Sequence, residues 1–209
     1  MSNKFETKWI KRRAGKLCLV ILLSAILLLS GCGEAGTDVM TLKRIPYAGD
    51  IVNEVPELVN STEGLEIFEF TLDEGISGYS VDVWYLENGQ WVSGGRTVDT
   101  MEQGTAWIGI QLTETGCSLF TENEYGVSRV DFDFSTGLDM CPDTNKIRWM
   151  LGEEGITPGF EQQLMMDAGW RDDQEAKNKY SCSDFREVDC DAGAAITITF
   201  TPDDAVETA

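Results

Sequence analysis

Residues 79–92 read Tyr-Ser-Val-Asp-Val-Trp-Tyr-Leu-Glu-Asn-Gly-Gln-Trp-Val, and this stretch decides the fold class. From Tyr79 to Tyr85 every second side chain is large and apolar, which places these side chains on one face of a β-strand. Asn88-Gly89 follows, and this dipeptide readily takes the positive φ angles of a type I′ turn. We therefore predict a hairpin that returns through residues 90–92.

The same alternation continues on both sides of this hairpin. Phe68, Phe70 and Leu72 lie two residues apart before it, and Gly94-Gly95 permits a further turn or a bulge after it. Further strands are expected at 106–112, 117–121, 129–134, 146–151 and 195–201. Short strands at such intervals are typical of a mostly antiparallel β-sandwich.

One segment has a different period. Thr157 and Pro158 suit the N-cap and first position of a helix. Apolar residues then recur every four positions, and Gly169 is placed to cap the C-terminal end in the left-handed conformation. We predict one short helix inserted into the sandwich, with its apolar side formed by Phe160, Leu164 and Ala168.

The N-terminal segment, from Met1 to Gly31, differs from the rest of the chain. Six basic residues precede the uncharged, apolar run from Leu17 to Ser30. As a helix this run would be about 21 Å long at ~1.5 Å per residue, shorter than the ~30 Å hydrocarbon core of a bilayer. The segment is therefore interpreted as an export signal and not as a permanent span.

Leu29-Ser30-Gly31-Cys32 completes this signal. The motif resembles the lipobox of bacterial lipoproteins: Leu, two small residues and Cys. The resemblance covers only the signal region. It implies cleavage before Cys32, a diacylglycerol on the Cys32 sulfur, and lipid anchoring on the extracytoplasmic face of a membrane in the bacterial cell envelope. Two or three acyl chains would anchor the protein stably. A plain secretory signal cleaved further on is the alternative.

These features divide the chain into four parts: a signal peptide (1–31), a flexible lipid-anchored tether (32–61), the β-sandwich (62–202) and an acidic disordered tail (203–209). Removal of the signal leaves the chain from Cys32 to Ala209, whose length suits one domain. Part of the tether could add an edge strand, because the residues before Pro46 and Pro56 favour extended backbone.

The exported chain is strongly acidic. The full chain has 16 basic and 36 acidic residues, and loss of the signal leaves 10 and 35, a net charge of about −25. Such a field repels phosphates, so it disfavours nucleic acid and docking of a basic patch on anionic lipid. An acidic surface also serves solubility.

Four cysteines remain after the signal is removed. An even number in an exported chain indicates disulfides, and four cysteines permit three pairings. We predict the sequential pairing, Cys117 with Cys141 and Cys182 with Cys190. The chain has no C-x-x-C spacing, which disfavours a zinc site made of cysteines.

The chain has no histidine. Ser-His-Asp and Cys-His nucleophiles, histidine-ligated zinc and a histidine proton shuttle are therefore excluded. Catalysis by two carboxylates, as in glycosidases, is compatible with the composition, but no pattern identifies a pair. No catalytic residue or cofactor is predicted.

An acidic motif tests the possibility of calcium binding. Asp131-x-Asp133-x-Ser135 resembles the start of an EF-hand loop. The sixth position is Thr136 where the loop needs glycine, and the twelfth is Pro142 where it needs glutamate. We interpret the motif as a strand with solvated acids, and we predict no metal site.

Two tryptophans are the candidate ligand-binding residues. Trp84 and Trp107 fall on the less apolar faces of their predicted strands, where indole rings can stack on sugars. Large aromatic residues also dominate ordinary cores and protein contacts, so packing in the core and a protein-binding patch are the alternatives.

The sequence thus favours a lipid-anchored envelope protein with a non-catalytic domain that binds an unidentified protein or glycan. A carboxylate-based hydrolase of glycans or cell wall is the alternative from another class. A structural accessory that interacts only through assembly in a complex is a third possibility. The fold alone cannot choose among them.

Overall fold

A computed structural model of the chain describes residues 40–46, 64–72, 74–100, 104–123, 126–171 and 184–203. The predicted signal peptide, the lipobox with Cys32, Cys182 and the tail beyond Asp203 lie outside these residues. Within them, no helix is both long and apolar enough to cross a membrane.

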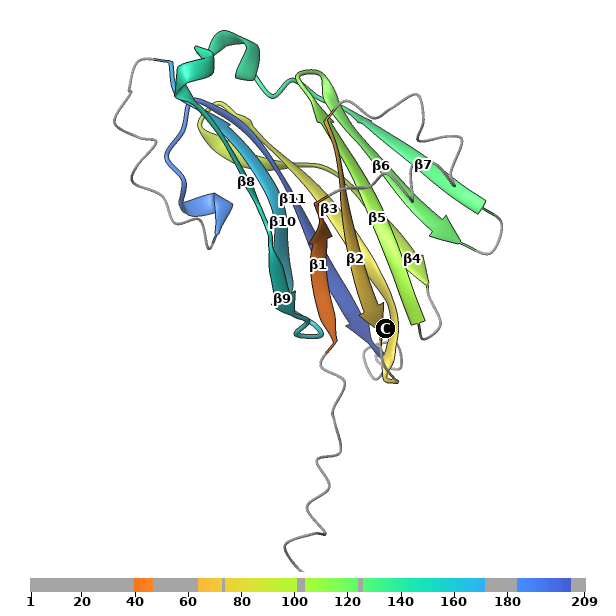
Figure 1. The fold of residues 1–209 in the computed structure, drawn as a ribbon. Coiled ribbons are helices and arrows are strands. Elements are labelled where there is room, and N and C mark those ends of the chain that lie inside the picture. Colours follow the sequence, from red (N-terminus) through yellow and green to blue (C-terminus); the bar gives the residue numbers. More distant parts are fainter. Residues whose placement is uncertain are drawn as a thin grey trace, which may run out of the picture. The chain divides into compact units, whose positions relative to one another are not determined.

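The described residues form two antiparallel sheets (Figure 1). The six-stranded sheet has the order β7-β6-β5-β2-β1-β9, and the five-stranded sheet has the order β4-β3-β11-β10-β8. The first sheet contains β1 (Thr41–Ile45), β2 (Leu65–Leu72), β5 (Gly104–Thr113), β6 (Gly116–Asn123), β7 (Gly126–Asp133) and β9 (Glu153–Gly155). The second contains β3 (Ile76–Glu87), β4 (Gln90–Thr100), β8 (Lys146–Met150), β10 (Glu161–Gly169) and β11 (Ala192–Pro202). The 3₁₀ turns are η1 (Leu138–Met140), η2 (Asp143–Asn145) and η4 (Phe185–Glu187).

The main core lies between the two sheets. It is built from alternate positions of the central strands, which are almost fully buried. The ring of Phe70 on β2 meets Tyr79 on β3 and Phe200 on β11 at centroid distances of 5.0 and 5.2 Å. The prediction of a mostly β antiparallel sandwich is confirmed.

The predicted hairpin is also present. Asn88 and Gly89 have φ angles of 52° and 75°, as a type I′ turn requires, and they join β3 to β4. The register of the two strands shifts opposite Gly94, where β4 carries one extra residue. This is the bulge that Gly94-Gly95 permitted.

The predicted inserted helix is wrong: residues 157–160 form a turn, and Glu161–Gly169 form strand β10. This strand lies between β11 and β8, and the segment that precedes β11 packs on its outer face. Because both faces are covered, consecutive residues such as Met165 and Met166 are buried. A spacing of four is also an even spacing, so the pattern of a helix face appeared in a strand.

Gly169 has a different role from the predicted helix cap. It ends β10, and a Cβ atom built there would lie 2.9 Å from the Cys141 sulfur. The position therefore needs glycine because another side chain packs against its backbone.

Strand β1 lies within the stretch assigned to the tether. Thr41–Ile45 pairs with β2 on one side and with β9 on the other, so it is not an edge strand. The sandwich therefore begins well before residue 62. Residues 47–61 of the predicted tether lie outside the described residues.

Candidate binding face

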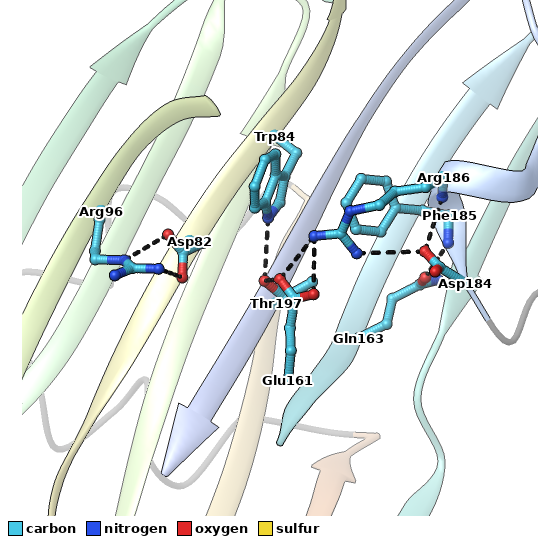
Figure 2. A network of polar contacts seen from close by, with 9 residues as sticks. All are labelled: Asp82, Trp84, Arg96, Glu161, Gln163, Asp184, Phe185, Arg186 and Thr197. Carbon is cyan, nitrogen blue, oxygen red and sulfur yellow. Dashed lines mark hydrogen bonds and ion pairs between the residues drawn. The ribbon is translucent and has the colours of Figure 1, made fainter. Parts of the chain in front are cut away.

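The outer face of the five-stranded sheet carries two neighbouring groups of polar and aromatic side chains, each linked by hydrogen bonds and ion pairs (Figure 2). Strand register sets these side chains in rows across the sheet. Arg96 on β4 lies opposite Asp82 on β3, which lies opposite Thr197 on β11. The next row contains Trp84 on β3 and Ala195 on β11. Each row thus combines residues that are distant in the sequence.

Asp82 and Arg96 form a bidentate ion pair on this face. Arg96 Nε and Nη2 donate to the two Asp82 carboxylate oxygens at 2.6 and 3.0 Å. The Asp82 side chain is 6% exposed and that of Arg96 is 60% exposed. The hydrogen bonds to Asp82, with the charge of that carboxylate, raise the pKa of Arg96 above its ordinary value. Arg96 therefore neutralises a buried carboxylate while its own side chain faces solvent.

A second chain of contacts connects Trp84 to Arg186. Trp84 Nε1 donates to Thr197 Oγ1 at 3.1 Å, and Thr197 Oγ1 donates to Glu161 Oε1 at 2.7 Å. Glu161 Oε2 lies 2.8 Å from Arg186 Nη2, and the guanidinium stands 4.6 Å from the centroid of the Trp84 ring. Burial lowers the pKa of Arg186, but its bonds and charge contacts with Glu161 and Asp184 outweigh burial and raise it overall.

Residues 184–191, here called the strap, cross this face and supply Arg186 to the second group of contacts. Phe185 is fully buried, and its ring lies 4.9 Å from Trp91 and 5.7 Å from Trp84. Its backbone N–H donates to Gln163 Oε1 at 2.8 Å. Farther along the strap, Trp170 Nε1 donates to the Asp189 carbonyl at 2.6 Å. The strap thus covers the aromatic half of the sheet.

One polar atom beneath the strap is unsatisfied. Trp91 Nε1 is buried and has no hydrogen-bond acceptor within the described part of the chain. The ring is still closely packed, since it lies over Gly193, where a Cβ atom would come within 2.9 Å of it. Packing against Phe185 therefore decides the position of Trp91.

The face continues beyond the strap, and the ion pair between Glu161 and Arg186 of the strap marks the boundary. Val98 is 67% exposed on edge strand β4, and the register continues from it through Ser80 and Thr199 to Glu161. We call Ser80, Arg96, Val98, Glu161 and Thr199 the open strip. It combines an apolar side chain with hydroxyl, guanidinium and carboxylate groups on a rigid sheet.

Trp107 lies on the other sheet, so the structure does not bring the two predicted tryptophans together. Trp107 is 7% exposed, packs with Ile67 and Phe120, and donates from Nε1 to Glu122 Oε2 at 2.6 Å. Trp84 is half-buried, with Arg186 over its ring. Neither indole presents a bare, flat face of the kind that sugars stack on.

The predicted Cys117–Cys141 disulfide is wrong, because the two residues lie in separate buried clusters; both are free thiols in this structure. Cys117 on β6 points into the core between the sheets, where burial raises its pKa to about 12. Cys141 follows η1 and packs against Leu138 and Ala192. Cys190 is also a free thiol, and its predicted partner Cys182 lies outside the described residues.

The first acid of the EF-hand-like motif, Asp131, already has partners. Asp131 on β7 accepts from Ser118 Oγ at 2.6 Å and from Arg129 Nε at 2.8 Å. In the part of the chain that the structure describes, no group of three or more cysteine, aspartate and glutamate side chains is arranged to hold a metal ion. The contacts of Asp131 suit an ion-paired strand surface.

Two acids face the space between the sheets, and each is bound by an arginine. Arg44 Nη2 lies 2.7 Å from Glu66 Oε2, and Arg148 Nη2 lies 2.6 Å from Asp167 Oδ2. The Arg148 charge also interacts with Glu66. Both carboxylates are thus held in ion pairs within the fold.

Sequence reasoning identified Trp84 but missed the charged groups around it. Asp82 carries a signal, because alternation places this acid on the outward side of a strand between Ser80 and Trp84. For Arg96 and Arg186, the periodicity of the sequence gives no signal that they belong to this site. Their positions depend on the β4 bulge and on the path of the strap.

Comparison with family models, curated proteins and solved structures finds no match to this chain. The function must therefore be inferred from the chain's own residues.

Proposed function

We propose that this chain is a lipid-anchored protein of the bacterial envelope, whose sandwich is a non-catalytic module that binds another envelope protein through the open strip. Anchoring follows from the lipobox at Cys32. The chemistry of the partner follows from the charges of the described residues and from the covered tryptophans.

The observation that carries this proposal is the pairing of nearly every cation. The described residues contain eight lysines and arginines against 21 aspartates and glutamates. Seven of these eight cations are in ion pairs with carboxylates, the exception being Arg171, which donates to the Met140 sulfur. Polyanions need several accessible cations, so the acidic domain selects a neutral or basic partner.

The open strip suits a protein better than a sugar chain. Sugar recognition by stacking needs an exposed aromatic ring, whereas the rings of Trp84 and Trp107 are both covered. Val98 offers apolar contact, while Arg96 and Glu161 provide charged groups beside it. Apolar contact surrounded by charged and hydroxyl groups is common in protein interfaces.

The position of β1 sets how far the domain can stand from the membrane. Eight residues lie between Cys32 and Thr41, the first residue of β1. Fully extended, they span at most about 29 Å, at no more than ~3.6 Å per residue. An anchor on Cys32 therefore holds the sandwich close to the membrane surface, where its partner must also be reachable.

Site-specific photo-crosslinking in intact cells tests the binding face. A photoreactive residue at Val98 should capture a defined envelope protein, and the same residue at Thr71, exposed on the other sheet, should not. Equal capture at both positions, or at neither, contradicts the proposal. Co-sedimentation with purified cell-wall glycan is the companion measurement, and retention there would assign the strip to a glycan.

Metabolic labelling with a fatty acid tests the anchor separately. The wild-type protein should incorporate label and fractionate with membranes. Cys32→Ser should lose the label and remain in the unprocessed form. Label that persists in this variant would contradict the lipobox interpretation.

A further inference from the structure

Cys141 and Asp191, the residue after Cys190, both contact Gly169 at the end of β10, although the two cysteines are far apart in the sequence. The Cys141 sulfur packs on Gly169, at 2.9 Å from where a Cβ atom would stand. The carbonyl of Gly169 accepts a hydrogen bond of 2.9 Å from the N–H of Asp191, the residue after Cys190. The same glycine thus contacts one cysteine and the direct neighbour of the other.

Ala192 is a second point that the two cysteines share. Cys141, Leu138 and Ala192 form a small buried cluster, and the backbone of Ala192 hydrogen-bonds to the Cys190 sulfur. The ionised form of Cys141 contributes to raising the pKa of Cys190, after burial of Cys190 itself and the charges of Asp189 and Asp191. Gly169 and Ala192 thus contact Cys141 on one side and the segment of Cys190 and Asp191 on the other, which brings the two cysteines to the same end of β10.

The alternative partners fit less well. Cys117 is on β6 in the main core, among residues of both sheets, and belongs to a different cluster from either thiol. Cys141 is 4% exposed, so a partner must come from inside the fold. Cys190 is half-buried at the base of the strap and meets this requirement.

We propose that Cys141 and Cys190 form a disulfide in the exported protein, which fastens the strap to the loop after η1. The bond replaces the sequential pairing expected from the spacing of the cysteines. It would close a loop that contains β8, β9 and β10, and it would hold the strap, with Phe185, over Trp84 and Trp91.

The oxidation needs a disulfide as oxidant, either a thiol–disulfide oxidoreductase or oxidised glutathione. The more exposed Cys190 loses its proton, and its thiolate attacks the oxidant disulfide and releases one oxidant thiol. The Cys141 thiolate, after losing its own proton, then attacks the Cys190 sulfur of the mixed disulfide and releases the second thiol. Two protons and two electrons leave the protein, and one disulfide is reduced to two thiols.

The pairing is tested on the purified full chain in a glutathione redox buffer, which makes the result independent of lipid anchoring. Free thiols are blocked by alkylation, and the unreduced digest is mapped by mass spectrometry. The expected result is a cross-linked peptide pair containing Cys141 and Cys190, lighter than the separate peptides by two hydrogen atoms. A Cys182–Cys190 pair, or alkylated Cys141 in the oxidised protein, would overturn the proposal.

Substitution provides the matched controls. Cys141→Ser and Cys190→Ser should each abolish the cross-linked pair and leave the remaining partner alkylated. Cys117→Ser should leave the cross-link unchanged. Loss of the cross-link in Cys117→Ser, with its native circular dichroism retained, would also count against the assignment.

Thermal unfolding provides a second measurement. A loop of this length predicts a melting temperature about 5–10 °C lower in the reduced protein than in the oxidised one. The double variant Cys141→Ser/Cys190→Ser should show no such dependence on reductant. If reduction lowered the melting temperature of the double variant equally, the stabilisation would come from another bond, and the proposal would be overturned.

Discussion

The outer faces of the two sheets differ in how deeply each buries a tryptophan. On the six-stranded sheet, Trp107 is almost fully buried with Ile67 and Phe120, and its N–H is satisfied by Glu122. On the five-stranded sheet, Trp84 is half-buried between the strap and a network of ion pairs. One outer face is therefore closed around its tryptophan, and the other is covered only in part.

The two outer faces therefore differ in which side chains they expose. The closed face offers little besides packing energy, because its aromatic residues have no free surface. The partly covered face leaves an apolar valine, a guanidinium and hydroxyl groups in reach of a partner. Measurements of stability and binding should therefore separate the two faces.

The largest expected effect is the loss of the Trp107 side chain. Trp107→Ala should destabilise the fold by about 4 kcal/mol, because it removes a buried indole and leaves a cavity. Trp84→Ala should cost about 2 kcal/mol, since its ring is only half-buried. Urea unfolding followed by circular dichroism measures both. If Trp84→Ala were the more costly variant, the assignment of the closed and open faces would be reversed.

Loss of Phe185 should have the next largest effect. Phe185→Ala removes the ring that fills the space between Trp84 and Trp91, at an expected cost of about 3 kcal/mol. The tryptophan emission should also move to longer wavelength as water reaches the two indoles. Phe160→Ala is the matched control, because Phe160 is 67% exposed and should cost less than about 0.5 kcal/mol.

The main features of the sandwich could be predicted from the chain, because a half-buried strand shows its alternation directly. Tyr79 to Tyr85 and Asn88-Gly89 predicted β3, the turn and β4, and the structure has all three. Strand β10 could not be predicted in this way. With both faces covered it has no alternation, and its apolar run was indistinguishable from a helix by period alone.

The candidate site was less predictable than the fold. Trp84 could be placed on an outward face, but its partners come from β10, β11 and the strap. Contacts of this kind depend on the order of strands in a sheet, which periodicity does not determine. The pairing of cysteines has the same origin, because the end of β10 lies between Cys141 and the strap.

One ion pair on each outer face can be compared in the same way, because the pair on the five-stranded sheet has a buried member and the pair on the six-stranded sheet has none. Arg96→Ala leaves the buried Asp82 carboxylate without its partner, at an expected cost of about 1–2 kcal/mol in urea unfolding, reduced by solvent access on the arginine side. Lys43→Ala on the other sheet breaks a pair with Glu69 in which both side chains are partly exposed, and should have almost no effect. If both variants lost a similar free energy of unfolding, the Asp82 carboxylate would not be shielded from water.

The smallest expected effect is a pH dependence at Asp131. Its hydrogen bond from Ser118, with the contribution of Arg129, holds the pKa of this carboxyl below its ordinary value of 3.8. The stabilisation is therefore present above that pH and is lost as the pH falls through the lower pKa of the folded state. Asp131→Asn should reduce the acid-dependent fall in melting temperature between about pH 5 and pH 3 by roughly 1 °C, as expected for a weak, exposed pair. Asp133→Asn is the control, because Asp133 lies two residues along β7 and has neither contact; it should leave the acid-dependent fall in melting temperature unchanged. An equal change in both variants would assign that fall to net charge and not to the Ser118 contact.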